Sequence, residues 1–257
     1  MKAIHLQTDY LTGPLGLGNP QPRFYWNCEG GITQTAYQIV CKRGGETVWD
    51  SGKVDSSSMA HIRYAGQPLQ SRDRITWSVR LWDENDAPGE TNESAFELGL
   101  LEASDWTAKW ISGNYQIEKN RRYPVDCFRK EFVARGKIVK ARLYATARGI
   151  YDVTINGTRL ENFILAPGVT DYRRRIQVQT YDVTALLQKE NTMEIRLADG
   201  WFRGSVAAYG VTNVFGTQIS VMAQLELTLS DGTIQTICTD DTWDWCNDGP
   251  IRFADLK

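Results

Sequence analysis

Apolar and polar residues alternate along this chain in short runs, and no other feature limits the fold as much. In residues 75–81, Ile75, Trp77, Val79 and Leu81 occupy one set of alternate positions, and polar residues occupy the other. Successive side chains of a β-strand point to opposite faces, so this pattern predicts a strand with one buried face. Similar runs recur between clusters of turn-forming residues. The chain is therefore expected to be all-β.

Two dipeptides predict β-hairpins. Asn156-Gly157 follows an alternating run, and Asn-Gly supplies the two positive φ angles that a type I′ turn needs. Asp231-Gly232 follows alternating leucines and predicts a second hairpin of the same kind. Residues 182–191 are the one stretch whose pattern suggests a short helix.

Two domains are expected, with a boundary near residue 104, where a strand-like run ends and Ser104-Asp105-Trp106 begins a new one. Residues 1–103 have the length and strand spacing of an immunoglobulin or fibronectin-III-like sandwich. Residues 104–257 have longer loops and better suit a jelly-roll sandwich, the architecture of many carbohydrate-binding modules.

Composition excludes several classes of function. The 29 basic and 31 acidic side chains give a net charge of −2, which argues against a nucleic-acid partner. No apolar run is long enough to span a membrane. The five cysteines are odd in number and form no CxxC motif, which argues against zinc and favours free thiols in a reducing compartment. We expect a cytoplasmic protein if Met1 is native, and a periplasmic or secreted one if a signal peptide has been removed.

Catalytic motifs are missing from the sequence. Both histidines, His5 and His61, fall in the first domain, and no nucleophile elbow, phosphate-binding loop or HExxH motif occurs. Acidic residues are plentiful, but their spacing places no two of them across a glycosidic bond; the candidates are Glu161, Asp171, Asp199, Asp240 and Asp241. Residue patterns alone thus indicate a two-sandwich binding or scaffold protein.

Several motifs of the first domain occur in the order known from one family. They are NPQPRFYW (residues 19–26), QTAYQI (34–39), WDSGKV (49–54) and TWSVRLWD (76–83). Together they resemble the fibronectin-III-like sandwich that opens bacterial α-L-rhamnosidases of glycoside hydrolase family 78.

The second domain continues this resemblance. Its matching motifs include DWTAKWI (105–111), FRKEF (128–132), LAPGVTDY (165–172), ADGWFRG (198–204) and GPIRFAD (249–255). They are similar to the rhamnosidase N-terminal domain, a jelly roll. In the family, two glutamates of a later (α/α) barrel perform inverting hydrolysis of terminal non-reducing α-L-rhamnose. No segment here resembles the start of that acidic site. The resemblance therefore implies a non-catalytic N-terminal fragment whose partner is the missing barrel.

The resemblance also implies a sugar and calcium site in the second domain. Carried over to this chain, its calcium ligands would be Glu161, Asn162 and Asn213, and a rhamnose-containing glycan would complete the shell. Two residues depart from the family pattern: Glu161 stands where an aspartate is usual, and Val169 stands where a tryptophan is usual. A purely structural role for these loops is the alternative. No other cofactor is implied.

The run ADGWFRG has two interpretations. As a sugar-binding edge, Trp201 presents its ring to a pyranose while Asp199 and Arg203 bond to hydroxyl groups. As a structural corner, the aromatic residues plug the sandwich and Arg203 pairs with a neighbouring acid. Either interpretation expects glycine to be required at Gly200 and Gly204.

Three other functions fit the sequence. A free-standing rhamnose-binding module would bind the sugar by itself, and a structural spacer would bind none. The accessory region of a β-galactosidase-like hydrolase is the third, because similar hairpin patterns recur in those sandwiches. The opening motifs of residues 19–54 favour the rhamnosidase.

Overall fold

The computed structural model describes residues 1–118, 121, 123–160, 164–206 and 210–253. The chain divides into two compact units, Met1–Asp105 (unit 1) and Trp106–Lys257 (unit 2). The division lies two residues after the boundary expected from the sequence. The helices of the described residues are single turns, and none is long and apolar enough to cross a membrane.

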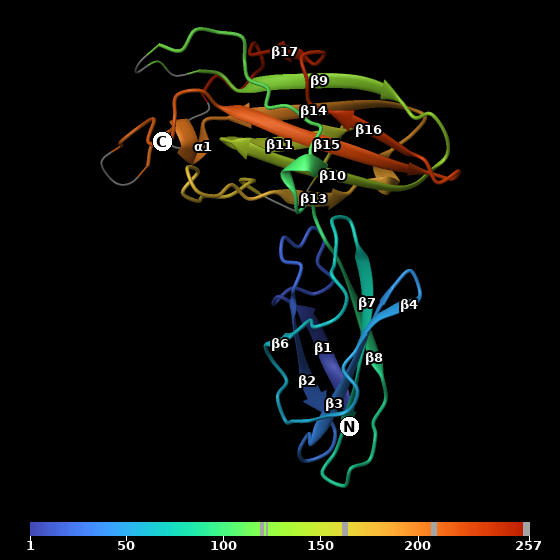
Figure 1. Ribbon diagram of the computed structural model, residues 1–257. Coiled ribbons are helices and arrows are strands. Elements are labelled where there is room, and N and C mark those ends of the chain that lie inside the picture. Colours follow the sequence, from blue (N-terminus) through green and yellow to red (C-terminus); the bar gives the residue numbers. More distant parts are fainter. Residues whose placement is uncertain (119–120, 122, 161–163, 207–209, 254–257) are drawn as a thin grey trace. The chain divides into compact units, whose positions relative to one another are not determined.

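Unit 1, all of whose residues are described, is built from antiparallel strands in two sheets (Figure 1). One sheet has the order β1-β2-β6. The other has the order β4-β3-β7-β8, with β5 paired to β3. The bounds are β1 Lys2–Thr8, β2 Arg23–Glu29, β3 Ala36–Arg43, β4 Glu46–Asp50, β5 Val54–Asp55, β6 Ile62–Arg63, β7 Arg74–Trp82 and β8 Asn92–Glu97, followed by the 3-10 turn η1 Ala103–Asp105.

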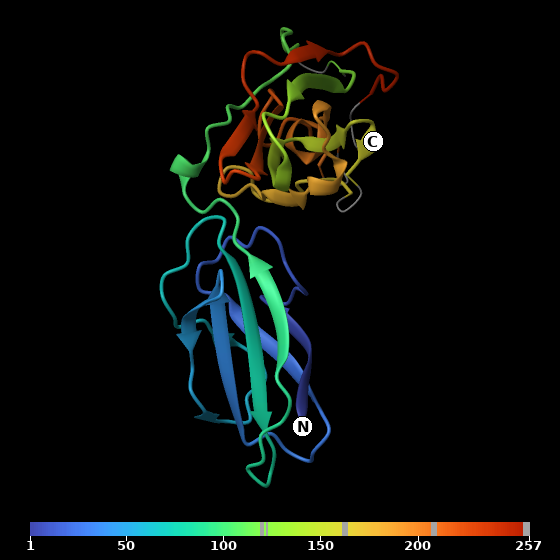
Figure 2. The same cartoon turned by 90° about the vertical axis from the view of Figure 1, so that its right-hand side faces the viewer.

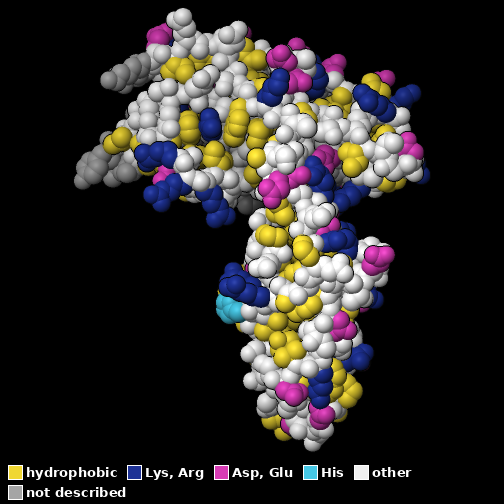
Figure 3. Space-filling view, in the orientation of Figure 1, with side chains coloured by type: hydrophobic (Ala, Val, Ile, Leu, Met, Phe, Trp, Pro, Cys, Tyr) yellow, Lys and Arg dark blue, Asp and Glu magenta, His cyan; other side chains and the backbone are white. Residues whose placement is uncertain are grey.

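The core of unit 1 lies between these sheets. The apolar positions of β7, from Ile75 to Leu81, are at most 1% exposed, which confirms the strand and its buried face. Phe24 of β2 packs its ring against Trp77, with ring centroids 4.5 Å apart, and so joins the two sheets. Charges of both signs are interspersed on the visible face of this unit (Figure 3).

Unit 2 is a second sandwich (Figures 1 and 2). Its sheets have the orders β13-β10-β15-β16 and β12-β11-β14-β9-β17, and their pairings are antiparallel. The bounds are β9 Asp126–Val133, β10 Ile138–Arg148, β11 Ile150–Ile155, β12 Thr158–Arg159, β13 Gln179–Asp182, β14 Glu190–Ala198, β15 Ser220–Leu229, β16 Ile234–Cys238 and β17 Asp244–Cys246, with the 3-10 turn η2 Thr184–Leu186 and the one-turn helix α1 Gly200–Arg203.

One apolar core lies between the two sheets of unit 2. It includes fully buried side chains from both of them, such as Leu143 and Leu225 of one sheet and Ile155 and Ile195 of the other. Two facing antiparallel sheets around one core form a sandwich. The all-β prediction is thereby confirmed.

The two predicted hairpins form, but they use different turns. At Asn156-Gly157, φ is +51° and +80°, as a type I′ turn requires. At the second hairpin, Gly232 has a positive φ and Asp231 does not, so the prediction of the same turn type was wrong. Gly232 N–H bonds to the Leu229 carbonyl, which closes a type I turn with a left-handed glycine after its central residues.

The helix suggested for residues 182–191 reduces to the 3-10 turn η2. Asp182 Oδ1 accepts hydrogen bonds from the Thr184 amide and hydroxyl, which holds a tight turn at this point. Leu187 is already extended, and β14 begins at Glu190. The local side-chain bonds and the following strand leave no room for a longer helix.

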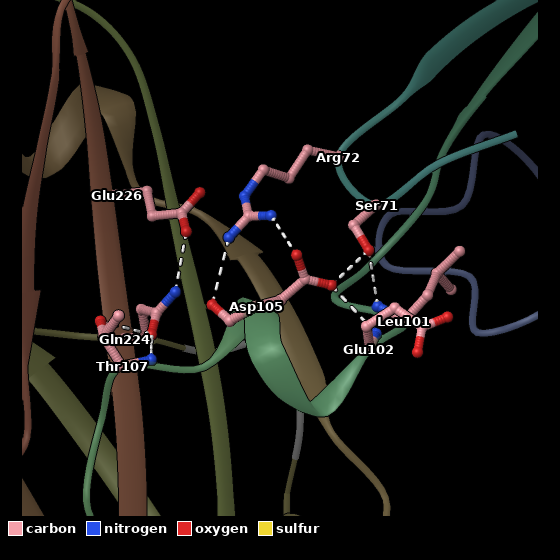
Figure 4. A network of polar contacts seen from close by, with 8 residues as sticks. All are labelled: Ser71, Arg72, Leu101, Glu102, Asp105, Thr107, Gln224 and Glu226. Carbon is pink, nitrogen blue, oxygen red and sulfur yellow. Dashed lines mark hydrogen bonds and ion pairs between the residues drawn. The ribbon is translucent and has the colours of Figure 1, made fainter.

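Polar contacts within each unit hold the chain on both sides of the division (Figure 4). In unit 1, Asp105 pairs with Arg72 at 2.8 Å and accepts a hydrogen bond from the Ser71 hydroxyl. In unit 2, Gln224 Oε1 accepts a hydrogen bond from the Thr107 amide at 2.8 Å. Each unit therefore fixes its own end of the connecting backbone.

Candidate functional site

The run ADGWFRG leaves the end of β14 and forms α1. Gly200 has φ +51°, and a Cβ at this position would lie 2.4 Å from Cγ1 of Ile150. Both facts require glycine. Gly204 has φ −73° and ψ −168°, an extended conformation that other residues adopt. The backbone conformation thus requires glycine at Gly200 but does not by itself require it at Gly204.

Asp199 and Arg203 pair with each other inside unit 2. Nε and Nη2 of Arg203 donate to Oδ1 of Asp199 at 2.9 and 2.6 Å. The two side chains are only 8% and 4% exposed. Burial opposes the charge of Arg203, but the hydrogen bond and charge of Asp199 outweigh it and raise the arginine pKa. The pair faces the interior, which favours the structural interpretation of this corner.

Arg203 also contacts aromatic residues that come earlier in the chain. Its Nη1 donates to the hydroxyl of Tyr115 at 3.0 Å, and its guanidinium carbon lies 4.7 Å from the ring centroid of Tyr123. Burial is the main cause that raises the pKa of Tyr115 to about 12. The hydroxyl therefore stays protonated, and it donates to Oδ2 of Asp126 at 3.1 Å.

Asp126 is fully buried at the start of β9. Its Oδ1 accepts a hydrogen bond from the indole of Trp245 at 3.0 Å, and the indole ring stacks on Tyr115. Burial raises the pKa of Asp126 even though both hydrogen bonds oppose the shift. We call Tyr115, Asp126, Asp199, Arg203 and Trp245 the Arg203 cluster. It ties α1 to β9, to β17 and to the segment before β9.

Two loops meet at the end of unit 2 that carries α1. Tyr172 packs its ring against Phe202, with centroids 5.4 Å apart, and against Phe215 at 5.1 Å. Trp201 packs partly on the core and is partly exposed. Val169 is exposed in the first of these loops. We call this region, residues 164–176 and 199–218 where described, the loop end.

Asn213 belongs to the loop end. Its backbone N–H donates to the Arg203 carbonyl at 2.9 Å, and its backbone φ is +58°. In the side chain, Nδ2 donates to the Thr212 hydroxyl. Glu161 and Asn162 lie outside the described residues. No cluster of three or more His, Cys, Asp or Glu with the arrangement of a metal site occurs among the residues that are described. These residues alone do not compose a calcium cage, and calcium binding stays a prediction.

Sequence reasoning missed Asp126, Tyr115 and Trp245. A signal for Asp126 exists in the alternation of its strand, because it is in phase with the buried Phe128 two positions later. An acid on the buried face of a strand requires partners inside the protein. No comparable pattern marks Tyr115 or Trp245, because their partners come from distant parts of the chain.

Known protein families match both units. The Rha78A-like N-terminal immunoglobulin domain matches residues 3–102, and the alpha-L-rhamnosidase N-terminal domain matches residues 136–256. An α-L-rhamnosidase of Formosa agariphila is 37% identical over 99% of this chain and 30% of its own length. One from Alteromonas sp. (strain LOR) is 36% identical over 95% of this chain and 28% of its own.

Solved structures agree with these matches. The native α-L-rhamnosidase from Aspergillus terreus has a TM-score of 0.90 and 30% identity, covering 99% of this chain and 30% of that one. The enzyme from Dictyoglumus thermophilum has a TM-score of 0.87 and 30% identity, with the same coverage. The chain thus spans less than a third of the length of these four relatives. By these matches, the chain carries the two N-terminal domains of the α-L-rhamnosidase family.

Proposed function

We propose that this chain is the non-catalytic N-terminal region of an α-L-rhamnosidase, an enzyme that releases terminal α-L-rhamnose from glycosides. One observation carries the proposal: 99% of this chain aligns with the rhamnosidase of Formosa agariphila, yet the chain spans only 30% of the length of that protein. The remaining length of such an enzyme would hold the catalytic barrel.

The chemistry of the described acids supports this division of labour. Inverting hydrolysis needs two carboxyl groups about 6.5–9.5 Å apart, one of them held protonated by a raised pKa. Asp126 has a raised pKa, but it is fully buried and bonded to Tyr115 and Trp245, so no substrate reaches it. Hydrogen bonds from the side chain and backbone of Arg173 lower the pKa of the exposed Asp171, which suits a proton acceptor rather than a proton donor.

In this proposal, the two sandwiches brace the barrel, and the loop end of unit 2 contacts rhamnose-containing glycans. Trp201 and Asn213 support the second role, because Trp201 belongs to α1, the backbone of Asn213 bonds to the last residue of α1, and both are partly exposed. Glu161 and Asn162 would add oxygen ligands for calcium there. The Asp199–Arg203 pair would support these groups from beneath without touching the sugar.

A chromogenic rhamnoside tests the catalytic part of the proposal. The purified chain should release no nitrophenol from p-nitrophenyl α-L-rhamnopyranoside, whereas the product of the full reading frame of the source gene should do so. Turnover by the chain itself would contradict the proposal. So would a stop codon directly after the codon for Lys257, which would favour a free-standing binding or structural module.

A further inference from the structure

Cys127 and Cys246 are far apart in the sequence but lie opposite each other in a sheet of unit 2. β17 pairs antiparallel with β9, and the register places Cys246 directly across from Cys127. Figure 1 shows β17 beside β9. β17 is the edge strand of this sheet, and β9 is its neighbour within it. No other pair of the five cysteines shares a strand register.

The two thiols share the outer face of the sheet. Phe128, between Cys127 and Arg129 in the sequence, points into the core and is 2% exposed, so its neighbours point outward. Cys127 is half-buried and Cys246 is exposed. Both border a groove of about 300 Å³ that is also lined by Arg196. A small molecule therefore has access to both sulfur atoms.

The spacing fits a covalent bond between the two residues. Directly opposed residues of antiparallel strands have Cα atoms about 4.5–5.5 Å apart, and disulfides need about 4.4–6.8 Å. The thiols also interact as they stand: burial raises the pKa of Cys127, and the charge and hydrogen bond of Cys246 raise it further. These two ranges overlap, so the strand register is compatible with a disulfide.

We infer that Cys127 and Cys246 are an oxidation site at which a disulfide-type oxidant forms a cross-strand cystine. With oxidised glutathione as the oxidant, the thiolate of the more exposed Cys246 attacks one glutathione sulfur and releases one glutathione thiolate. The thiolate of Cys127 then attacks the Cys246 sulfur of this mixed disulfide and releases the second. Two protein thiols are oxidised, one glutathione disulfide is reduced, and the two protons pass to the released thiolates.

The cystine would act on the Arg203 cluster. β17 is a strand of three residues with one neighbouring strand, and it carries Trp245, which bonds to Asp126. A covalent bond at Cys246 fixes the adjacent Trp245 against β9. A bond that closes the long loop between the two cysteines should also raise the thermal midpoint of unit 2 by about 5 °C or more.

Thiol counting and peptide mapping test the inference on the whole chain. Incubation with oxidised glutathione should lower the number of titratable thiols in the unfolded protein from the five free cysteines to three, because the bond consumes two of them. A protease digest should contain a peptide pair joined through Cys127 and Cys246, and dithiothreitol should separate it. The thermal midpoint should rise on oxidation and return on reduction.

Matched serine variants provide the controls. Cys127→Ser and Cys246→Ser should each block the joined peptide and the thermal shift, whereas Cys28→Ser in unit 1 should leave both intact. The inference is overturned if all five thiols stay titratable, if the cystine joins other cysteines, or if Cys246 remains a glutathione mixed disulfide while Cys127 stays reduced. Thiol counts, peptide masses and thermal midpoints give these outcomes, so none of them depends on rhamnosidase activity.

Discussion

Replacing Arg203 with methionine removes the positive charge from a buried ion pair and removes the two hydrogen bonds that the guanidinium donates to Asp199. Both side chains are less than one-tenth exposed. Removing one member of a buried pair costs about 3–5 kcal/mol, because the remaining charge stays desolvated. The variant also loses the hydrogen bond to Tyr115 and the contact with the ring of Tyr123. We expect unit 2 to lose about 4 kcal/mol, or roughly 10 °C in its thermal midpoint.

Differential scanning calorimetry of the whole chain is the assay, because two units can unfold in separate transitions. Arg129→Met is the matched control in the same unit. Arg129 pairs with Glu131, and the two side chains are 52% and 68% exposed. Loss of such a surface pair costs less than about 1 kcal/mol. The double variant Asp199→Asn with Arg203→Met should lose less than the sum of the single variants, because it leaves no buried charge unpaired.

The result that refutes this reasoning is equally concrete. If Arg203→Met changes the midpoint no more than Arg129→Met does, the ion pair does not support the fold. If that same variant also loses affinity for L-rhamnose at full stability, Arg203 contacts the sugar, and the binding-edge interpretation of ADGWFRG is correct.

Three further predictions concern the same unit. In urea titrations, Gly200→Ala should destabilise unit 2 by about 2 kcal/mol or more, and Gly232→Ala by about 1 kcal/mol. Both glycines have a positive φ, but only at Gly200 would a Cβ also clash with a neighbour. Equal losses for the two variants would contradict this reasoning. The raised pKa of Asp126 means that the folded protein holds the Asp126 proton more tightly than the unfolded chain does. The contribution of this proton to stability is therefore complete below the ordinary carboxyl pKa of about 3.9, and it is lost as the pH rises through the pKa of Asp126 in the folded protein. Asp126→Asn should therefore reduce the fall in the urea midpoint as pH rises above about 4, and an unchanged slope would contradict the assignment. Calorimetric titration of the chain with L-rhamnose should show binding that a calcium chelator abolishes and that Asn213→Ala weakens about tenfold. If no heat is released with calcium present, the prediction is contradicted, and unit 2 has a structural role only.

The sequence predicted those features that depend on local periodicity. The alternation of β7 correctly placed four side chains in the core. In any β-strand, successive side chains point to opposite faces, so this prediction needs no knowledge of the rest of the chain. The turn at Asn156-Gly157 was equally local. The type of the turn at Asp231 was not, because the Asp231 side chain bonds to the Thr233 amide and hydroxyl and helps to hold a different geometry.

The partners in the site could not be predicted from local patterns. ADGWFRG is equally compatible with charges that face a sugar and with charges that face the interior. The choice depends on Tyr115 and Asp126, which lie more than seventy positions away and come from other parts of unit 2. The opposition of Cys127 and Cys246 depends in the same way on how the short edge strand β17 is placed. Pairing across such separations follows from the tertiary structure.

The geometry of α1 divides its residues between two tasks. Asp199, Phe202 and Arg203 face inward, where Asp199 and Arg203 form an ion pair and Phe202 packs on Tyr172. Trp201 and the backbone carbonyl of Arg203 face the loop end, and that carbonyl holds the amide of Asn213. A sugar at the loop end would then depend on Arg203 only through the loop that its backbone positions. Substitution of the Arg203 side chain should consequently lower sugar affinity in proportion to the loss of stability. Substitution of Trp201 should lower affinity by more than its loss of stability accounts for, because part of its ring is exposed.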